Sequence, residues 1–265
     1  MIEVKNISKT FDGFVAVDDV SFKVEEGENV VFLGMSGSGK TTLLKMINRL
    51  IEPNSGEIRI QGRPVHEQAP EILRRKIGYV FQNTGLFPHY TVGENIGIVP
   101  GLLGWEKEKV RLRTTELMEK LNLPAGKYLS SYPHQLSGGQ QQRVGLARAL
   151  AAYPPVLLMD EPFGALDPIT RAGVRKDFKE LDELKSKTIV LVTHDVQEAF
   201  ELADRICLLD KGKIVQAGTP EQLLHEPANA YVQHFFEDQR LQLEMKLIGG
   251  ADYKALLNEF LHFKN

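Results

Sequence analysis

A glycine-rich loop between an apolar run and a helical pattern constrains this chain of 265 residues more than any other segment. Residues 30–33 are apolar, as in a strand, and residues 42–47 have the spacing of a helix. The loop between them is Gly34-Met35-Ser36-Gly37-Ser38-Gly39-Lys40-Thr41. In this context G-x-x-x-x-G-K-[ST] is typical of a phosphate-binding loop, because glycines let N–H groups turn inward around a phosphate and the helix N-terminus adds positive charge. A flexible Gly-Ser loop could match by chance, but it would not explain the flanking strand and helix.

The loop predicts a nucleoside triphosphate as ligand. Lys40 can reach the β- and γ-phosphates, and the Thr41 hydroxyl can ligate Mg²⁺. The residues expected to hold the phosphates are Gly34, Met35, Ser36, Gly37, Ser38, Gly39, Lys40, Thr41 and Thr42.

Short apolar runs that alternate with helical patterns predict an α/β fold. Residues 156–159 and 189–192 are apolar throughout, as in buried parallel strands, while residues 2–7 and 15–24 alternate as half-buried strands do. We expect a right-handed crossover topology. Helical spacing dominates from residue 91 to residue 152, which predicts a mostly helical insertion at about 88–153.

Composition limits the compartment and the partners. A net charge of −3 argues against a nucleic-acid partner. The single cysteine, Cys207, lies in an apolar run and is expected to be a buried thiol in a reducing compartment. No signal peptide is visible, and the longest apolar stretch, Ile96 to Trp105, is far shorter than the ~20 residues that span a bilayer. We therefore expect a cytoplasmic chain that reaches a membrane only through a partner.

Polar side chains follow three of the expected strands. Asp160 and Glu161 end an apolar strand, where open α/β sheets hold ligands. Asp160 suits a partner of Mg²⁺, and Glu161 suits a base for an attacking water. The alternative is an acidic strand end facing solvent, which the phosphate loop makes the weaker interpretation. His194 and Gln82 have similar places after other strands, but each alone is more often structural.

A second glycine-rich segment, residues 136–140, precedes another helical pattern. We call this segment, Leu136-Ser137-Gly138-Gly139-Gln140, the signature segment. Ser137 is a good N-cap, and the two glycines expose N–H groups at the helix start. A capped helix alone would explain Ser-Gly-Gly, but the complete pentapeptide shortly before the Asp160-Glu161 strand favours an anion-binding role.

Taken in order, these motifs resemble those of the ATPase subunits of ATP-binding cassette (ABC) transporters, over residues 1 to about 235. The resemblance implies a P-loop NTPase core with a mostly parallel sheet, an N-terminal antiparallel β lobe and an inserted helical subdomain. It also implies a head-to-tail dimer, with a second copy of the chain the expected partner. Two ATP molecules would lie between the phosphate loop of one subunit and the signature segment of the other, where Ser137 would act on the γ-phosphate.

The resemblance also assigns roles to individual residues. Glu161, His194 and Gln82 are expected to be catalytic, and Thr41, Gln82 and Asp160 to hold Mg²⁺. Outside the phosphate loop, the residues expected to contact ATP are Phe11, Ser137, Gly138, Gly139, Gln140 and Asp167. Phe11 would stack on adenine, although Phe14 is nearby and either aromatic could instead belong to a core.

Four further segments resemble the ATPase subunits of osmoprotectant importers, which take up glycine betaine, choline, carnitine or proline-type solutes. These are residues 81–89, residues 99–100 together with 103–105, residues 133–135 and residues 163–168. The resemblance implies transmembrane permease subunits that dock near Gln82–Trp105, an extracytoplasmic solute-binding protein, and a peripheral position on the cytoplasmic face of the membrane. Apolar side chains at 86–105 would suit such docking, although about half of them could fill the helical region's own core.

Other functions stay open at this point. Importer ATPases for polyamines, amino acids or anions share several of these segments, and the transported solute does not touch this subunit. A non-transport ABC ATPase usually has a second cassette or a long coiled-coil insertion, and neither pattern is present. A P-loop kinase would not need the signature segment, and no guanine-reading Asn-Lys-x-Asp is visible for a GTPase.

Many osmoprotectant ATPases continue into paired regulatory modules of the cystathionine-β-synthase type. Here residues 1–235 are expected to form the nucleotide-binding domain, and residues 236–265 a short helical tail without such modules. The tail is expected to pack on its own domain, with a dimer-contacting or regulatory role as the alternative.

Overall fold

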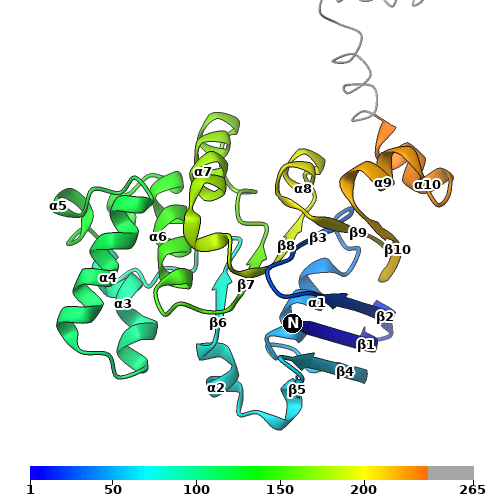
Figure 1. Cartoon of the computed structure of the whole chain (residues 1–265), viewed down its shortest axis with the longest axis horizontal. Helices are drawn as coiled ribbons and strands as arrows, with labels where there is room; N and C mark the ends of the chain where they lie inside the picture. The colour runs from blue at the N-terminus through cyan, green and yellow to red at the C-terminus, as the bar shows by residue number, and fades with distance from the viewer. Residues whose placement is uncertain (238–265) are drawn as a thin grey trace, which may run out of the picture.

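A six-stranded sheet forms the centre of the molecule (Figure 1), and its strands occur in the order β10-β9-β3-β8-β7-β6. The computed structural model describes residues 1–237 of the chain. The six strands are β3 (Asn29–Leu33), β6 (Ile77–Val80), β7 (Val156–Asp160), β8 (Thr188–Thr193), β9 (Arg205–Asp210) and β10 (Lys213–Gly218). All neighbours pair in parallel except β10, which runs antiparallel to β9. The mostly parallel sheet predicted from the apolar runs is therefore confirmed.

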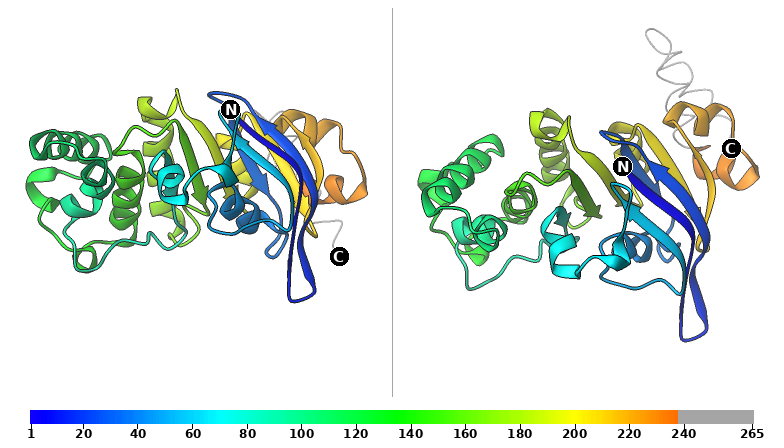
Figure 2. Two further views of the ribbon diagram at one scale, coloured as in Figure 1. Left: turned by 90° about the horizontal axis from the view of Figure 1, so that it is seen from below. Right: turned by 60° about the horizontal axis from the view of Figure 1, so that its bottom comes forward.

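A second, antiparallel sheet with strand order β2-β1-β4-β5 lies beside the first (Figure 2). Its strands are β1 (Ile2–Phe11), β2 (Phe14–Val24), β4 (Ser55–Ile60) and β5 (Arg63–Pro64). β1 is longer than the alternating segment at residues 2–7. Register shifts in its pairing with β2 break the two-residue period, so the sequence pattern ends before the strand does. The antiparallel N-terminal β lobe is confirmed, with a longer first strand than the pattern suggested.

Helices cover the parallel sheet and extend from one end of it. The helices are α1 (Lys40–Ile47), α2 (Pro70–Arg75), α3 (Val92–Leu102), α4 (Lys107–Lys120), α5 (Ala125–Tyr128), α6 (Gly138–Leu150), α7 (Pro168–Glu180), α8 (Val196–Leu202), α9 (Pro220–His225) and α10 (Ala230–Phe235). Short 3₁₀ turns are η1 (Val65–Glu67), η2 (Pro133–Gln135) and η3 (Asp182–Leu184). Figure 1 shows α3, α4, α5 and α6 gathered at the end of the molecule opposite the N-terminal sheet. These four helices lie within residues 88–153.

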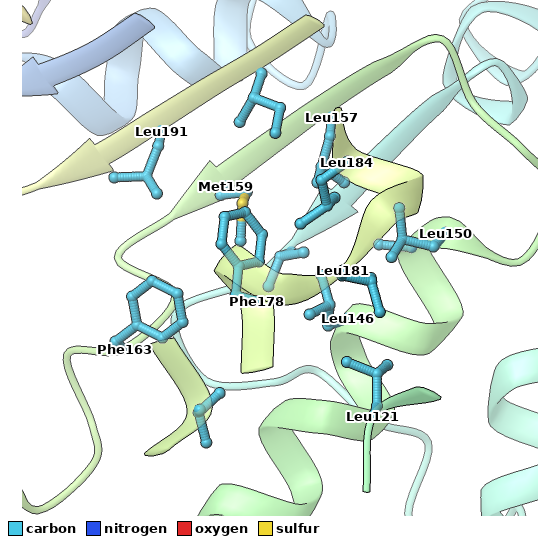
Figure 3. Close-up of a cluster of buried hydrophobic side chains, with 14 of the residues drawn as sticks. Leu121, Leu146, Leu150, Leu157, Met159, Phe163, Phe178, Leu181, Leu184 and Leu191 are labelled. Atoms are coloured by element: carbon cyan, nitrogen blue, oxygen red, sulfur yellow. The ribbon is translucent and has the colours of Figure 1, made fainter. Parts of the chain in front are cut away.

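Two clusters of buried apolar side chains hold these layers together. In one of them, Leu157 and Met159 of β7 pack among side chains of α6 and α7, such as Leu146 and Phe178 (Figure 3). Complete burial of a side chain of this size contributes roughly 1.5–3 kcal/mol, so β7 is firmly anchored. The carboxylates at its end therefore occupy fixed positions relative to α6 and α7.

The chain's remaining apolar features agree in part with the sequence predictions. Cys207 is completely buried in β9, as expected. Within residues 1–237, no helix is both long enough and apolar enough to cross a bilayer. At the end of that range Val232 and Phe236 are buried, whereas most of the expected tail, residues 238–265, lies outside the described residues.

Candidate nucleotide-binding site

The phosphate loop connects the end of β3 to the start of α1, as predicted. Gly37 and Gly39 have φ angles of 81° and 99°, in the left-handed region that favours glycine. A side chain at Gly39 would collide with the backbone oxygen of Ala16 in β2, and one at Gly34 with that of Leu209 in β9. Neighbouring strands therefore pack so close to the loop backbone at these two positions that only glycine fits there.

Lys40 places a buried cation within this loop. Its side chain folds back so that Nζ donates to the carbonyl oxygens of Gly34 and Met35, each at 2.8 Å. Burial lowers the pKa of Lys40, while the nearby Glu161 and Asp160 act in the opposite direction. A bound phosphate would offer Lys40 charged oxygen acceptors in place of these neutral carbonyls. Hydrogen bonds between two charged groups are about twice as strong as those between neutral ones. The loop thus fits a phosphate group.

Thr41 and Asp160 form a pair of oxygen donors beside the loop. The Thr41 hydroxyl donates to Asp160 Oδ1 at 2.8 Å, so the first turn of α1 touches the end of β7. Asp160 is 6% exposed, and burial raises the pKa of its carboxyl, partly offset by the hydrogen bond from Thr41. Mg²⁺ in nucleotide sites usually takes one or two protein oxygens together with phosphate oxygens. This hydroxyl–carboxylate pair fits that donor set.

Glu161, directly after β7, contacts one side chain from the end of each strand beside β7, namely β6 and β8. Gln82, after β6, donates from Nε2 to Glu161 Oε2 at 3.0 Å, and His194 Nδ1, after β8, lies 3.3 Å from the same oxygen. Glu161 itself has a φ of 44°, which is unusual for a residue with a side chain, and its N–H donates to the carbonyl of Val192. This constrained backbone directs the carboxylate toward Gln82 and His194, so the structure brings together all three predicted catalytic side chains.

These groups open into one pocket of about 630 Å³. Its lining residues are Phe11, Phe14, Ala16, Met35, Ser36, Gly37, Ser38, Gly39, Lys40, Thr41, Thr42, Gln82, Glu161 and His194. Gly34 and Asp160 do not line the pocket themselves. Each is hydrogen-bonded to a residue that does, Gly34 to Lys40 and Asp160 to Thr41.

Sequence reasoning missed Ala16 as a lining residue and did not count Phe14 among the ATP contacts, although it placed Phe14 near Phe11. The two aromatics are directly paired across the tip of the β1–β2 hairpin, and their exposed fractions are 40% and 64%. The Asp12-Gly13 turn between them could have revealed this pairing, because Asp-Gly is the preferred dipeptide of a two-residue hairpin.

The signature segment lies at the N-terminus of α6 and does not line this pocket within residues 1–237. Ser137 caps α6, with Gln140 completing a capping box. A side chain at Gly139 would collide with Thr170 of α7, so the glycine also allows close packing of two helix starts. Asp167 caps α7 by accepting hydrogen bonds from the N–H groups of Ile169 and Thr170.

The apolar stretch after Gln82 divides into buried and exposed parts. Ile96 is completely buried in the core, whereas Phe87 and Tyr90 are 44% and 38% exposed. Phe87 also lines a groove of about 360 Å³ together with Phe81 and Val99. An apolar surface of this kind therefore lies next to the segment that follows β6 and contains Gln82.

Comparison with known proteins identifies the family. The ABC transporter family model matches residues 17–164, which is more than half of the chain, and the chain belongs to this family. Two solved structures of one dimeric ATP-binding cassette share the fold. One of them, in a post-hydrolysis state with ADP and phosphate, has a TM-score of 0.74 and 37% identity, and covers 83% of this chain and 99% of that one. The other, a bacterial ABC transporter cassette, has a TM-score of 0.75 and 38% identity over the same shares of the two chains.

Two named relatives are bacterial proteins. The chain is 53% identical over 242 residues to the glycine betaine/carnitine/choline transport ATP-binding protein OpuCA of Bacillus subtilis (strain 168), covering 91% of this chain and 63% of OpuCA. It is 49% identical over 254 residues to the glycine betaine uptake system ATP-binding protein YehX of Escherichia coli (strain K12), covering 96% of this chain and 82% of YehX. The chain thus spans less than two thirds of the length of OpuCA.

Proposed function

We propose that this chain is the ATP-hydrolysing subunit of an ABC importer for a small osmoprotectant, such as glycine betaine, choline or carnitine. The observation that carries the proposal is the position of Glu161, which contacts both Gln82 and His194 at the edge of the phosphate-loop pocket. The substrate class rests on the relatives, since OpuCA and YehX are both named for the transport of glycine betaine.

Glu161 is the general base for hydrolysis. A water oxygen attacks the γ-phosphorus, the bond between the γ-phosphoryl group and ADP breaks, and Glu161 accepts the proton that the water loses. His194 and Gln82 hold the Glu161 carboxylate and orient the water, while Lys40 binds the phosphates.

Thr41, Asp160 and Gln82 would hold Mg²⁺, which neutralises charge on the phosphate oxygens when it is bound. The contact between the Thr41 hydroxyl and the Asp160 carboxylate supports this assignment, because it places two oxygen donors side by side next to the phosphate loop.

The complete site forms between two copies of the chain arranged head to tail. Ser137 and the neighbouring N–H groups of α6 act on the γ-phosphate bound by the partner, with Gly138, Gly139, Gln140 and Asp167 at the interface. Two observations support this arrangement: the signature segment does not line the pocket of its own chain within residues 1–237, and both matched solved structures are of a dimeric cassette. ATP drives closure because it binds the closed dimer more tightly than the open one. Phe11 stacks on the adenine.

Permease subunits dock on the apolar surface near Gln82–Trp105, which places the chain on the cytoplasmic face of the membrane. Exposed Phe87 and Tyr90, and the groove beside them, support this surface as the contact. Residues 1–235 act as the nucleotide-binding domain with a helical subdomain at 88–153. An extracytoplasmic solute-binding protein delivers the solute.

Uptake of labelled glycine betaine and choline tests the proposal in cells that lack this protein and other osmolyte importers. Wild type and Glu161→Gln are reintroduced separately, at low and at high external salt. We expect uptake with wild type only. If wild type restores no uptake of these solutes, the substrate assignment fails, and the same strains are then tested with polyamines, amino acids and anions.

A further inference from the structure

One arginine joins two loops of the site that are far apart in the chain. Arg171 lies in the first turns of α7, and its Nη2 donates to the carbonyl of Leu166 at 3.0 Å. Its Nη1 donates to Asp195 Oδ2 at 3.3 Å. We call residues 162–167 the Asp167 loop and residues 193–195 the His194 loop. The Arg171 guanidinium is therefore bonded to both loops.

Through the His194 loop, Arg171 is separated from the proposed catalytic side chains by a single residue, Asp195. Asp195 is fixed in place, because it caps α8 through the N–H of Glu198 and its own N–H donates to Thr193 Oγ1 at 3.0 Å. His194 precedes it and contacts Glu161. A shift of Asp195 therefore changes how His194 meets the Glu161 carboxylate.

The Asp167 loop, which Arg171 also contacts, contains a residue of the proposed dimer interface. This loop begins directly after Glu161 and is held by a hydrogen bond from the N–H of Gly164 to the Glu161 carbonyl, at 3.1 Å. Leu166, whose carbonyl binds Arg171, precedes Asp167 at the start of α7. Force on this loop from a partner subunit would therefore act on the guanidinium.

We propose that Arg171 is a positioning residue that links engagement of the partner subunit at the Asp167 loop to the placement of His194. The inference rests on the proposed function, since it assumes hydrolysis at Glu161. A guanidinium suits the task because its planar fork holds two acceptors at a fixed spacing, which a lysine ammonium does not. The remaining Nε–H of Arg171 is buried and has no acceptor within residues 1–237, so these contacts are not simply optimised for stability.

The same two helices offer a matched control. Arg175 lies one turn further along α7, and its Nε is 2.9 Å from Glu201 Oε2 of α8. Like Arg171 it forms an ion pair between α7 and the segment of α8 and its cap, and within residues 1–237 it makes no hydrogen bond to either loop. Arg175→Gln therefore removes an ion pair between α7 and α8 and leaves both loops intact.

The test measures ATP hydrolysis by the purified full chain and its Arg171→Gln, Arg171→Lys and Arg175→Gln variants. We expect Arg171→Gln to lower kcat by about tenfold or more with little change in KM, because it misplaces a catalytic side chain without touching ATP. Arg171→Lys should not restore kcat, and Arg175→Gln should stay within about twofold of wild type. Equal kcat values for Arg171→Gln and Arg175→Gln would overturn the inference.

A double-mutant cycle with Asp195→Asn adds a readout that a purely structural role would not change. Asparagine caps a helix as well as aspartate does, so α8 should remain intact while the charge that pairs with Arg171 is lost. If Arg171 acts through Asp195, adding Arg171→Gln to Asp195→Asn should slow the enzyme little further. Fully additive effects would contradict the link between the two loops.

Glu161→Gln in the same assay separates this inference from the proposed function. If Glu161→Gln loses most of its activity while Arg171→Gln hydrolyses ATP at the normal rate, the inference about Arg171 is wrong and the proposed function stands. Absence of ATP hydrolysis by the wild type would remove both.

Discussion

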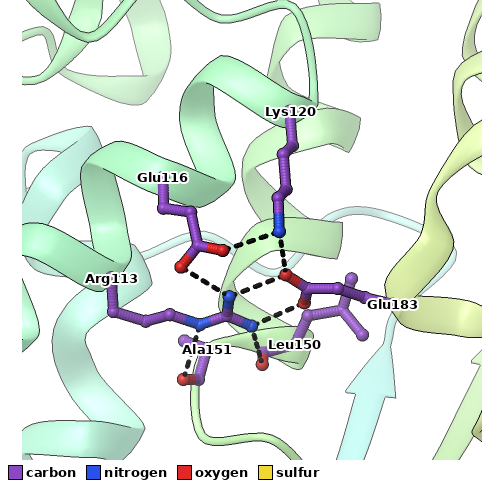
Figure 4. A network of polar contacts seen from close by, with 6 residues as sticks. All are labelled: Arg113, Glu116, Lys120, Leu150, Ala151 and Glu183. Atoms are coloured by element: carbon purple, nitrogen blue, oxygen red, sulfur yellow. Dashed lines mark hydrogen bonds and ion pairs between the residues drawn. The ribbon is translucent and has the colours of Figure 1, made fainter.

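Arg113 of α4 is central to a buried polar network whose loss should destabilise the fold measurably (Figure 4). Its Nη1 and Nη2 bind the two carboxylate oxygens of Glu183 in η3 at 2.7 and 2.6 Å. The same guanidinium donates to the carbonyls of Leu150 and Ala151 at the end of α6. Lys120 also binds Glu183, at 2.8 Å. The network thus connects α4 to η3 through one bidentate pair and to the end of α6 through two hydrogen bonds.

Two independent arguments give the size of the effect for Arg113→Met. The side chains of Arg113 and Glu183 are only 3% and 14% exposed, and removing one partner of a buried pair costs about 3–5 kcal/mol. Burial would raise the pKa of Glu183, but hydrogen bonds from Arg113 and Lys120 lower it from 4.5 to about 2. A lowering of that size corresponds to about 3 kcal/mol of stability at neutral pH, to which Arg113 and Lys120 both contribute.

The pH dependence follows from the direction of this shift. A carboxyl whose pKa is lowered on folding contributes its stability above its unfolded pKa, and loses it as the pH falls toward its folded pKa. The contribution of Glu183 should therefore be complete at pH 7 and should shrink as the pH falls from 4.5 toward 2.

Urea unfolding followed by circular dichroism measures these differences at pH 7. We expect Arg113→Met and Glu183→Gln to lower the free energy of unfolding, the former by about 3 kcal/mol. Asp182→Asn is the matched control, because its ion pair with Lys185 lies in the same region and is as short, 2.6 Å, but is exposed to solvent. If Arg113→Met were as stable as Asp182→Asn, the network would contribute nothing and the argument from burial would be wrong.

Three further predictions concern the pocket and the core. Phe11→Ala should weaken binding of a fluorescent ATP analogue by about tenfold, as expected for loss of base stacking, and by more than Phe14→Ala does. Equal affinities for both variants would contradict the choice of Phe11. Gly39→Ala should abolish ATP binding in the same titration, because its φ is 99° and its new side chain would meet the Ala16 carbonyl; wild-type affinity would refute this. Burial raises the pKa of the Cys207 thiol to about 12, so native protein at pH 8 should not react with a disulfide reagent, whereas urea-unfolded protein should. Rapid reaction of the native protein would contradict its burial.

The fold and the meeting of the three proposed catalytic side chains were accessible from the sequence because they follow from local patterns and one topological rule. Residues after neighbouring parallel strands meet at one edge of a sheet, so Gln82, Glu161 and His194 converge once the strands are recognised. The phosphate loop was equally accessible, since its glycines and its flanking strand and helix are contiguous in the chain.

Contacts between long polar side chains were not accessible in this way. Arg113 and Glu183 are separated by 70 residues, and Arg171 and Asp195 by 24. Surface helices contain many arginines and carboxylates with similar spacing, and only the packing of α4, α7 and α8 decides which of them meet. The second role of Gly139 was hidden for the same reason, because the closeness of Thr170 depends on how α6 and α7 pack.

The most direct test of the proposed function compares wild type and Glu161→Gln in two measurements on the same purified protein. One is steady-state ATP hydrolysis, and the other is the molecular mass in solution with and without ATP. We expect Glu161→Gln to hydrolyse ATP about 10²–10⁴ times more slowly than wild type, as for loss of a general base, and to accumulate as an ATP-dependent dimer. Near-normal hydrolysis by Glu161→Gln would contradict the assignment of Glu161 as the base.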